Sequence, residues 1–236
     1  MEIIKLGSIY ANGHTYIPRF RRDGNENISL GDTVPGKELQ WIQYKGKLIG
    51  NRCACINVSW KQLDKIGYTF GWPVLIDGNC YLCRSLKVGA EEGEPNEWDD
   101  VLRFCGYEDS LWHWRDIEFW GQEAPADSCE VRVVRGFYSA TYFSAKRSTM
   151  LSTLIGFRPV LEPLPALDWS GISAGLRLIV YHKDGSIAEG TLSSLDDYDL
   201  WLSNVVWNHR DGRKPKTTKK TSLISKDDVV WGALKE

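Results

Sequence analysis

Short runs of alternating apolar and polar residues, separated by Gly and Pro, make up most of this chain. Such alternation is typical of half-buried β-strands. In the N-terminal part it predicts strands within residues 14–20, 39–44 and 45–51, with turns at 23–24 and 45–46. The pattern therefore indicates a chain built mainly from short strands.

Three further runs continue this pattern. Residues 53–60 (CACINVSW) and 129–137 (CEVRVVRGF) each predict one strand. Residues 72–86 predict a hairpin, because Asp77-Gly78 stands between two apolar runs and favours a tight turn.

Two helices are predicted among these strands. Ser59 is placed to cap a short helix that ends near Gly67. A second helix is expected to begin at 95–96 and to end at Gly106. Its apolar residues are three and four positions apart, which puts them on one face: Trp98, Val101, Leu102 and Cys105.

The pattern changes after residue 162. Residues 163–171 carry prolines and no periodicity, which indicates a linker between a domain at 1–162 and a second domain at 172–236. The second domain is expected to be a small all-β barrel, with a bend at Gly190 and a basic loop at 209–220. Its strands are predicted within the runs 175–185, 186–199, 199–207 and 221–234.

Composition limits the function without naming it. The net charge of −2 argues against a general nucleic-acid or membrane-binding surface. The N-terminus lacks the pattern of a signal peptide, and no window approaches the roughly 20 apolar residues that span a bilayer. We therefore expect a soluble, cytoplasmic protein with no membrane and no long nucleic acid as partner.

The six cysteines are expected to be buried thiols. The pairs Cys53/Cys55 and Cys80/Cys83 lie inside apolar runs rather than on turns; a zinc site is the alternative interpretation. Disulfides are not expected without an export signal. The four histidines show no metal-ligand spacing, so neither a metal nor a cofactor is expected.

Tryptophan is frequent, with 11 residues. The cluster Trp98, Trp112, Trp114 and Trp120 is interpreted as an aromatic core that includes His113. The alternative is a stacking platform for sugars or bases. Arg158 is expected to pair with an acid such as Glu162 or Asp116.

Residues 70–162 contain the runs IDGNCYLCRSLKVG, GEPNEWDDVL, LWHWRD, VRGFYSA and GFRPVLE. These runs resemble the C-type-lectin-like fold, in particular its formylglycine-generating-enzyme (sulfatase-modifying-factor) branch and bacterial and prophage proteins of that construction. The resemblance is most specific at Arg135-Gly136 and at 156–159 (GFRP). It implies an α+β domain with short strands and few helices, and an irregular ligand-facing surface between those two markers.

The chemistry of that family is not expected here. Its enzymes hold copper with two cysteines near the end of the domain, whereas Cys129 is the one cysteine after Gly106. The related sulfoxide synthases need a three-histidine iron site, which has no counterpart in this sequence. Residues 94–96 (EPN) and 98–100 (WDD) echo the calcium site of true lectins, but in the wrong order, and we interpret the echo as chance.

Residues 172–233 resemble Sm-like proteins, through 175–180 (GLRLIV), 190–192 (GTL), 196–198 (DDY) and 223–231 (LISKDDVVW). The resemblance implies a small Sm-like or SH3-like barrel that assembles into rings and binds RNA or nucleotides at loop residues. Leu200 replaces the base-gripping Asn of that family, and Ser225-Lys226 replaces its Arg-Gly, so base recognition by those positions is not expected.

Two sets of residues are candidate binding sites. Arg forks suit phosphate or carboxylate and aromatic rings suit bases, so the first set predicts a pocket for an anionic, planar ligand. This set consists of Arg132, Arg135, Tyr138, Tyr142, Lys146 and Arg147. The second set is either a phosphate-binding arm or a solvated hairpin tip. It consists of Arg210, Arg213, Lys214, Lys216, Lys219 and Lys220.

The sequence contains no Ser-His-Asp signature, Gly-rich phosphate loop or HExxH motif. We therefore expect a non-enzymatic ligand-binding protein that is a homo-oligomer and binds a small anionic molecule such as a nucleotide, or a sugar. The resemblance implies a phage or prophage origin, and one version sequesters an immune signalling nucleotide in the host cytoplasm. The alternatives are a virion component that recognises a receptor and a metal-dependent oxidase of the formylglycine-generating type.

Overall fold

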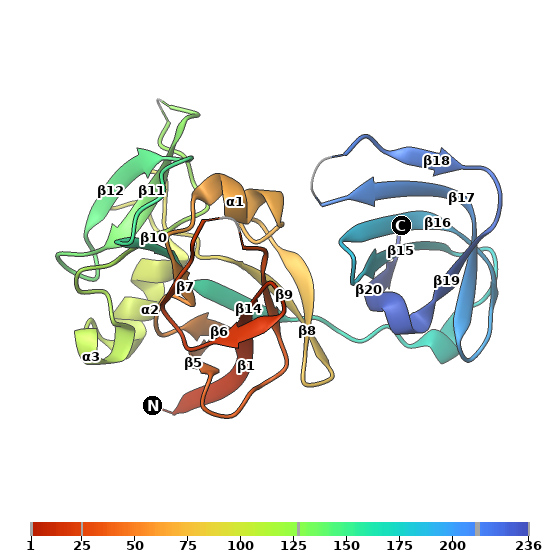
Figure 1. Ribbon diagram of the computed structural model, residues 1–236, viewed down its shortest axis with the longest axis horizontal. Helices are drawn as coiled ribbons and strands as arrows, with labels where there is room; N and C mark the ends of the chain where they lie inside the picture. Colours follow the sequence, from red (N-terminus) through yellow and green to blue (C-terminus); the bar gives the residue numbers. More distant parts are fainter. Residues whose placement is uncertain (1, 25, 127, 211–212, 236) are drawn as a thin grey trace. The chain divides into compact units, whose positions relative to one another are not determined.

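The structure, a computed structural model, describes residues 2–24, 26–126, 128–210 and 213–235. Strands predominate in these residues, with twenty strands and three α-helices (Figure 1). The chain divides into two compact units, Met1–Pro163 and Leu164–Glu236. The fold is therefore mainly β with a few short helices, in agreement with the strand-rich pattern of the sequence.

The first unit contains two sheets. The larger has the order β2-β1-β5-β6-β14-β9-β8, with β4 also paired to β1. Its strands are β1 (Ile3–Ala11), β2 (His14–Tyr16), β4 (Ile28–Gly31), β5 (Glu38–Tyr44), β6 (Lys47–Gly50), β8 (Trp72–Ile76), β9 (Asn79–Ser85) and β14 (Pro159–Pro163). The last strand of the unit, β14, lies between β6 and β9 and is antiparallel to both.

The smaller sheet has the order β12-β11-β10-β13-β7-β3. Its strands are β3 (Phe20–Arg21), β7 (Cys55–Ile56), β10 (Glu118–Trp120), β11 (Val131–Gly136), β12 (Phe143–Arg147) and β13 (Ile155–Phe157). The strand predicted over 53–60 is wrong in extent, because only β7 forms. Asn57 has a left-handed φ of 60°, and Ser59 begins a helix, so the extended backbone stops there.

Both predicted hairpin turns are confirmed. Lys45-Gly46 joins β5 to β6, and Asp77-Gly78 joins β8 to β9. The φ values of 47° and 76° in the first turn, and of 49° and 78° in the second, are those of tight hairpin turns with both residues left-handed.

The two predicted helices are also confirmed. In α1 (Trp60–Lys65), Ser59 Oγ accepts a bond from Gln62 N at 3.2 Å and Gln62 Oε1 accepts one from Ser59 N at 3.1 Å, which is a capping box. Helix α2 (Glu97–Cys105) is capped by Asn96 and ends at Gly106. A further short helix, α3 (Asp109–Trp112), was not predicted.

The core of the first unit is aromatic, as predicted for Trp98, Trp112 and Trp120, whereas Trp114 and His113 of the predicted cluster are only half-buried. Trp98, Trp112 and Trp120 are fully buried. The ring of Trp98 meets the rings of Trp112 and Phe119 edge-on, each at 5.0 Å between centroids. Helix α2 thereby packs against the second sheet, and the core continues to Ile42 and Ile49 of the first sheet.

Arg158 lies inside this core and is fully buried. Its guanidinium donates to the carbonyl oxygens of Gly50, at 2.9 Å, and Trp112, at 2.7 Å. It also lies over the rings of Trp98 and Phe119, at 5.0 and 4.6 Å. The predicted carboxylate partner, Glu162 or Asp116, is therefore wrong: carbonyl groups and aromatic faces hold this cation.

Gly136, in the marker Arg135-Gly136, lies where the backbone requires a glycine. Its φ is 101°, and a Cβ atom there would lie 2.5 Å from the Ile117 carbonyl oxygen. Gly13 has a comparable φ of 80°, but nothing lies within 4 Å of its Cβ position. We expect Gly136→Ala to lower the free energy of unfolding by about 1–3 kcal/mol more than Gly13→Ala, because only the former adds a clash. Urea denaturation of both variants measures this difference; equal losses would contradict it.

The thiols are buried in part. Cys53, Cys55 and Cys83 are buried, and burial raises the pKa of Cys55 to about 12. Cys80 and Cys105 are half-buried and Cys129 is exposed, so the expectation of a buried thiol holds only in part for the first two and is wrong for Cys129. It precedes β11 on the surface, outside the apolar part of that strand.

The second unit is a single sheet with the order β18-β17-β16-β15-β20, in which β19 also pairs with β17. Its elements are η1 (Trp169–Gly171), β15 (Arg177–His182), β16 (Ser186–Leu195), β17 (Asp199–His209), β18 (Lys216–Thr218), β19 (Ser222–Ser225), η2 (Lys226–Asp228) and β20 (Val229–Leu234). The apolar core consists of Leu178, Val180, Ala188, Leu192, Leu200, Leu202, Val205 and Ile224. Trp169, from the predicted linker, packs against this core.

Two sequence predictions are decided in this unit. The bend at Gly190 is confirmed, because the pairing of β16 with β17 shifts between Glu189 and Thr191. The basic loop at 209–220 is wrong in part, because β17 continues to His209 and β18 folds back onto it. Thr217 and Thr218 pair with Val206 and Val205, which shortens the irregular segment.

Among the described residues, every helix is too short or too polar to span a membrane.

Candidate functional site

The first predicted set of residues lies on and beside the β11–β12 hairpin. Arg132 pairs with Lys146, and Val131 pairs with Arg147. Because successive side chains of a strand point to opposite faces, Lys146 and Arg147 project from opposite sides of the sheet. The hairpin therefore does not gather this set into one pocket.

Arg135 is part of the scaffold. It is buried, its Nη1 donates to the Val88 carbonyl at 3.0 Å, and its Nη2 forms an ion pair with Asp99. The guanidinium also lies 5.6 Å from the centre of the Phe143 ring. These contacts connect β11 to helix α2. They also occupy the guanidinium group of Arg135 that the sequence analysis assigned to a ligand.

Lys146 and Arg147 have different surroundings. Lys146 lies 3.5 Å from the buried carboxylate of Glu118. Burial raises the pKa of Glu118, and the charge of Lys146 offsets part of this rise. Arg147 is exposed and lines a hollow of about 380 Å³ together with Lys61, Cys129 and Glu130. One cation thus neutralises a buried acid, while the other faces a shallow mixed surface.

The two predicted tyrosines do lie together. Tyr138 is 71% exposed, and its ring meets the rings of Phe137 and Tyr142 edge-on at 4.8 and 5.0 Å. Phe137 has a left-handed φ of 82°, and its backbone N donates to the Trp114 carbonyl at 2.9 Å. A residue without glycine's freedom holds this conformation only where its surroundings enforce it.

Trp114 extends the cluster, because its Nε1 donates to the Tyr107 carbonyl at 2.9 Å. We name the aromatic surface for its five members: Tyr107, Trp114, Phe137, Tyr138 and Tyr142. Arg115 lies over the Trp114 ring at 5.8 Å, and the backbone N of Arg115 donates to Asp109 Oδ1. The surface is therefore aromatic with charges of both signs. The predicted binding set omitted Phe137, the neighbour of Tyr138, and Tyr107, which comes from a separate segment; Trp114 was assigned to the aromatic core, with a stacking platform as the alternative.

The second predicted set is carried by β17, β18 and their flanks. We call Arg210, Arg213, Lys214, Lys216, Lys219 and Lys220 the basic hairpin. Arg210 N donates to the Gly185 carbonyl at 3.1 Å, and a Cβ on Gly185 would meet Arg210 Nε at 2.7 Å. Arg210 thus lies against the β15–β16 turn, while Arg213, Lys214 and Lys216 are exposed. Residues 211–212 of the predicted loop lie outside the described residues.

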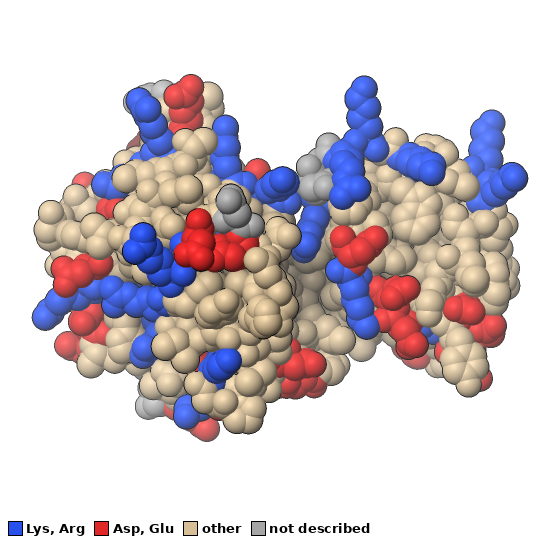
Figure 2. All heavy atoms as spheres, in the orientation of Figure 1, with Lys and Arg blue, Asp and Glu red and all other residues tan. Residues whose placement is uncertain are grey.

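Figure 2 shows Lys and Arg side chains over the β17–β18 edge of this unit and Asp and Glu side chains on another part of the visible face. Lys216 stands opposite Trp207 on β17, and the Trp207 ring lies 5.5 Å from the His182 ring. Cations and a half-buried indole therefore share this edge. Lysines on an edge strand also prevent that edge from pairing with other chains.

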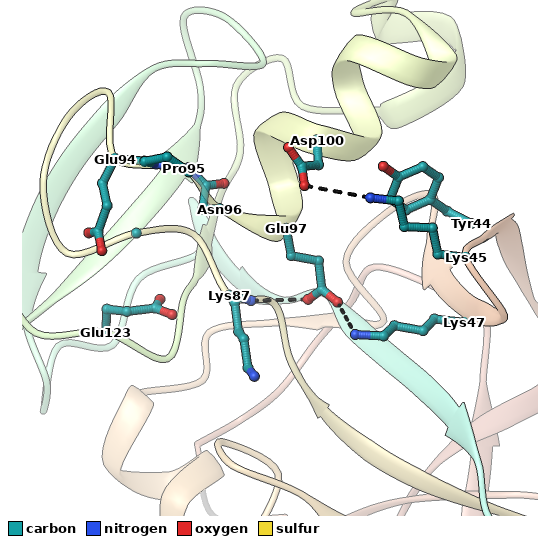
Figure 3. A pocket seen from close by; sticks show the side chains of 11 residues that line it. Tyr44, Lys45, Lys47, Lys87, Glu94, Pro95, Asn96, Glu97, Asp100 and Glu123 are labelled. Atoms are coloured by element: carbon teal, nitrogen blue, oxygen red, sulfur yellow. Dashed lines mark hydrogen bonds and ion pairs between the residues drawn. The ribbon is translucent and has the colours of Figure 1, made fainter.

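A cleft of about 450 Å³ opens between the β5–β6 turn, the 87–95 segment and the start of α2 (Figure 3). Below it lies a buried ion network. Glu97 bonds both Nη atoms of Arg84, at 2.8 and 2.7 Å, and Lys47 lies 2.9 Å from Glu97 and 3.3 Å from Glu162. Burial alone would raise the pKa of Glu97, but Arg84 and Lys47 lower it to about 2.

The echo of a lectin calcium site has a structural explanation. Asn96 Oδ1 accepts a bond from Asp99 N at 2.9 Å and caps α2, and Asp99 pairs with Arg135. Across the residues with described positions, no group of three or more His, Cys, Asp or Glu side chains is arranged to hold a metal ion. The runs 94–96 and 98–100 thus serve the start of a helix.

In comparisons with known proteins, the chain matches no family model and no curated sequence.

Proposed function

We propose that this is a non-enzymatic ligand-binding protein, with a C-type-lectin-like first unit and an Sm-like or SH3-like second unit through which it oligomerises. The basic hairpin binds a small anionic ligand. The strand order of the second unit, with the turn η2 between β19 and β20, supports the barrel assignment. The buried GFRP run, with Gly156 packed on Cys55, supports a scaffold role for that marker.

One observation carries the proposal: the exposed cations Arg213, Lys214 and Lys216 stand on one hairpin, where Lys216 lies opposite the half-buried Trp207. Cations of this kind contact phosphate oxygens, and an indole face stacks on a base. A nucleotide offers both groups. The most specific version of the function is sequestration of a small signalling nucleotide of host defence.

The experiment is calorimetric titration of the full chain with a panel of mono-, cyclic and cyclic di-nucleotides. We expect one or more to bind, and the double variant Lys214→Ala/Lys216→Ala to bind about 100-fold more weakly, because each lost charge-assisted contact contributes about 1.5 kcal/mol. The control, Lys5→Ala/Lys65→Ala, removes two exposed lysines of the first unit and should bind normally. Absence of binding across the panel, or equal loss in both variants, would contradict the proposal. Sedimentation tests the oligomer, which a monomer at all concentrations would contradict.

The aromatic surface favours a second candidate, recognition of a sugar, as a virion component would require. Ring faces with hydroxyl groups at their edges suit the apolar faces and hydroxyls of sugars. Asp109, which accepts a bond from Arg115 N, and Asp116, whose N donates to the Phe137 carbonyl, add negative charge beside this surface. Adding neutral sugars to the same panel separates the two candidates, because sugar binding should be lost in Tyr138→Ala and retained in the lysine double variant.

A further inference from the structure

The cleft of Figure 3 has charged walls of opposite sign. The carboxylates of Glu94 and Glu123 lie on one side, Lys45 and Lys47 lie on the other, and Glu97 stands between them. Its volume of about 450 Å³ is that of a site for a small molecule. None of these residues belongs to the aromatic surface or the basic hairpin.

The centre of the cleft is neutralised by its own residues. Glu97 is bound by Arg84 and Lys47, and Lys47 is shared with Glu162. The side chains of Arg84 and Glu97 are 3% and 10% exposed, so this network is part of the scaffold. Any ligand is therefore recognised by the groups to either side of it.

On the acidic side, Glu123 is a half-buried carboxylate that bonds a backbone donor instead of a cation. Its Oε2 accepts from Val88 N at 3.0 Å, and within the described residues it forms no ion pair. Burial raises its pKa, and the charge of Glu94 raises it further. Glu94 Oε2 accepts from Ala90 N at 2.6 Å, which holds that carboxylate at the rim. Two acids held by backbone donors thus lie on the same side of the cleft, and neither forms an ion pair with a residue that the structure describes.

On the basic side, Lys45 is exposed, and its ammonium lies 5.1 Å from the centre of the Tyr44 ring. Its side chain is 68% exposed, and it reaches Asp100 at 3.9 Å, the long limit of an ion pair. An exposed pair at this distance contributes about 0–1 kcal/mol, so Asp100 opposes the binding of a ligand anion to Lys45 only weakly. Lys87 is exposed at the same cleft and, among the residues that the structure describes, forms no ion pair.

We propose that this cleft binds a small organic zwitterion whose ammonium and carboxylate stand several bonds apart, such as an ω-amino acid. The ammonium binds between Glu123 and Glu94, and the carboxylate binds Lys45. A ligand with a single charge pairs either with the carboxylates of Glu94 and Glu123 or with the ammonium of Lys45, and leaves the opposite charge without a partner from the ligand. The zwitterion satisfies both, which is the basis of selectivity.

The test uses three probes of similar length: 6-aminohexanoate, hexylamine and hexanoate. Titration of the full chain, followed by NMR or calorimetry, should show saturable binding of 6-aminohexanoate, with each single-charge probe bound at least about tenfold more weakly, the loss of one charge-assisted contact. Equal affinity for hexylamine would overturn the zwitterion in favour of a plain amine site. Absence of saturable binding of 6-aminohexanoate would overturn the site altogether.

Variants locate the two ends. Glu123→Gln keeps the shape and the Val88 bond, and Lys45→Ala removes an exposed side chain, so both should fold. Each should weaken 6-aminohexanoate about tenfold, and Glu123→Gln should leave hexanoate binding unchanged. The control variants Glu130→Gln and Lys65→Ala change exposed charges outside the cleft and the basic hairpin and should bind normally. Equal loss in the controls would overturn the assignment. Nucleotide binding at the basic hairpin should be unaffected by Glu123→Gln, so the two proposals fail independently.

Discussion

Arg158→Leu is expected to cost on the order of 4 kcal/mol of the free energy of unfolding. The variant leaves the carbonyls of Gly50 and Trp112 buried without a donor, at about 1–3 kcal/mol each, and removes a cation from two aromatic faces. Leucine is apolar and of suitable size, so the loss comes from the polar partners rather than from an empty volume. Urea denaturation, followed by near-UV circular dichroism of the buried tryptophans, measures it.

The matched control is Arg147→Leu, because Arg147 is exposed and its loss should change stability by less than about 0.5 kcal/mol. Arg158→Lys keeps the charge but loses the fork that reaches two carbonyls, so an intermediate loss is expected. A loss below about 1 kcal/mol in Arg158→Leu would show that these carbonyls find other partners. If the leucine variant does not fold, the stability loss of Arg158→Lys can still be compared with that of Arg147→Leu.

Acid should destabilise the first unit through Glu97. The pKa of Glu97 in the folded state is about 2, against an ordinary value of 4.5. A lowered carboxyl pKa stabilises the folded state above 4.5, and this contribution is lost as pH falls from 4.5 to 2. The difference corresponds to about 3 kcal/mol. The pKa of Glu162 is also lowered, by Arg84 and Lys47 against the effect of burial, so it adds to the same loss.

Glu97→Gln should remove the part of this dependence that comes from Glu97. Stability at neutral pH should fall by about 3 kcal/mol, because the buried Arg84 loses its bidentate partner, and the curve of stability against pH should flatten between 4.5 and 2. Glu130→Gln, at an exposed acid, should leave the curve unchanged. Denaturation curves measured at several pH values decide the matter, and an unchanged slope in Glu97→Gln would contradict the assignment.

Local signals made much of the secondary structure predictable. Asp77-Gly78 and Lys45-Gly46 dictate tight turns through their own backbone preferences, and Ser59 with Gln62 closes a helix start within four residues. The helix at 97–105 followed from its apolar spacing. The strand at 53–60 was overestimated because Asn57 adopts a left-handed conformation that the apolar pattern does not reveal.

The candidate sites were less predictable, because they depend on contacts between distant segments. Arg158 bonds Gly50, which is 108 positions away, so its partner had no signal near it in the sequence. The cleft combines the β5–β6 turn with residues near 87–97 and Glu123, again without a local motif. The separation of Lys146 from Arg147 follows from strand alternation alone, and was missed because β12 was not expected to be a strand.

The position of β14 sets an order of events during synthesis. This strand is the last of its unit, yet it fills the middle of the larger sheet, where Val160 pairs with both Ile49 and Arg84. Until the ribosome has released residues 159–163, β6 and β9 each present an unpaired backbone edge, and such edges attract other chains. The nascent protein therefore completes this sheet late, by inserting a strand between two pieces made earlier, a non-local step of the kind that slows folding.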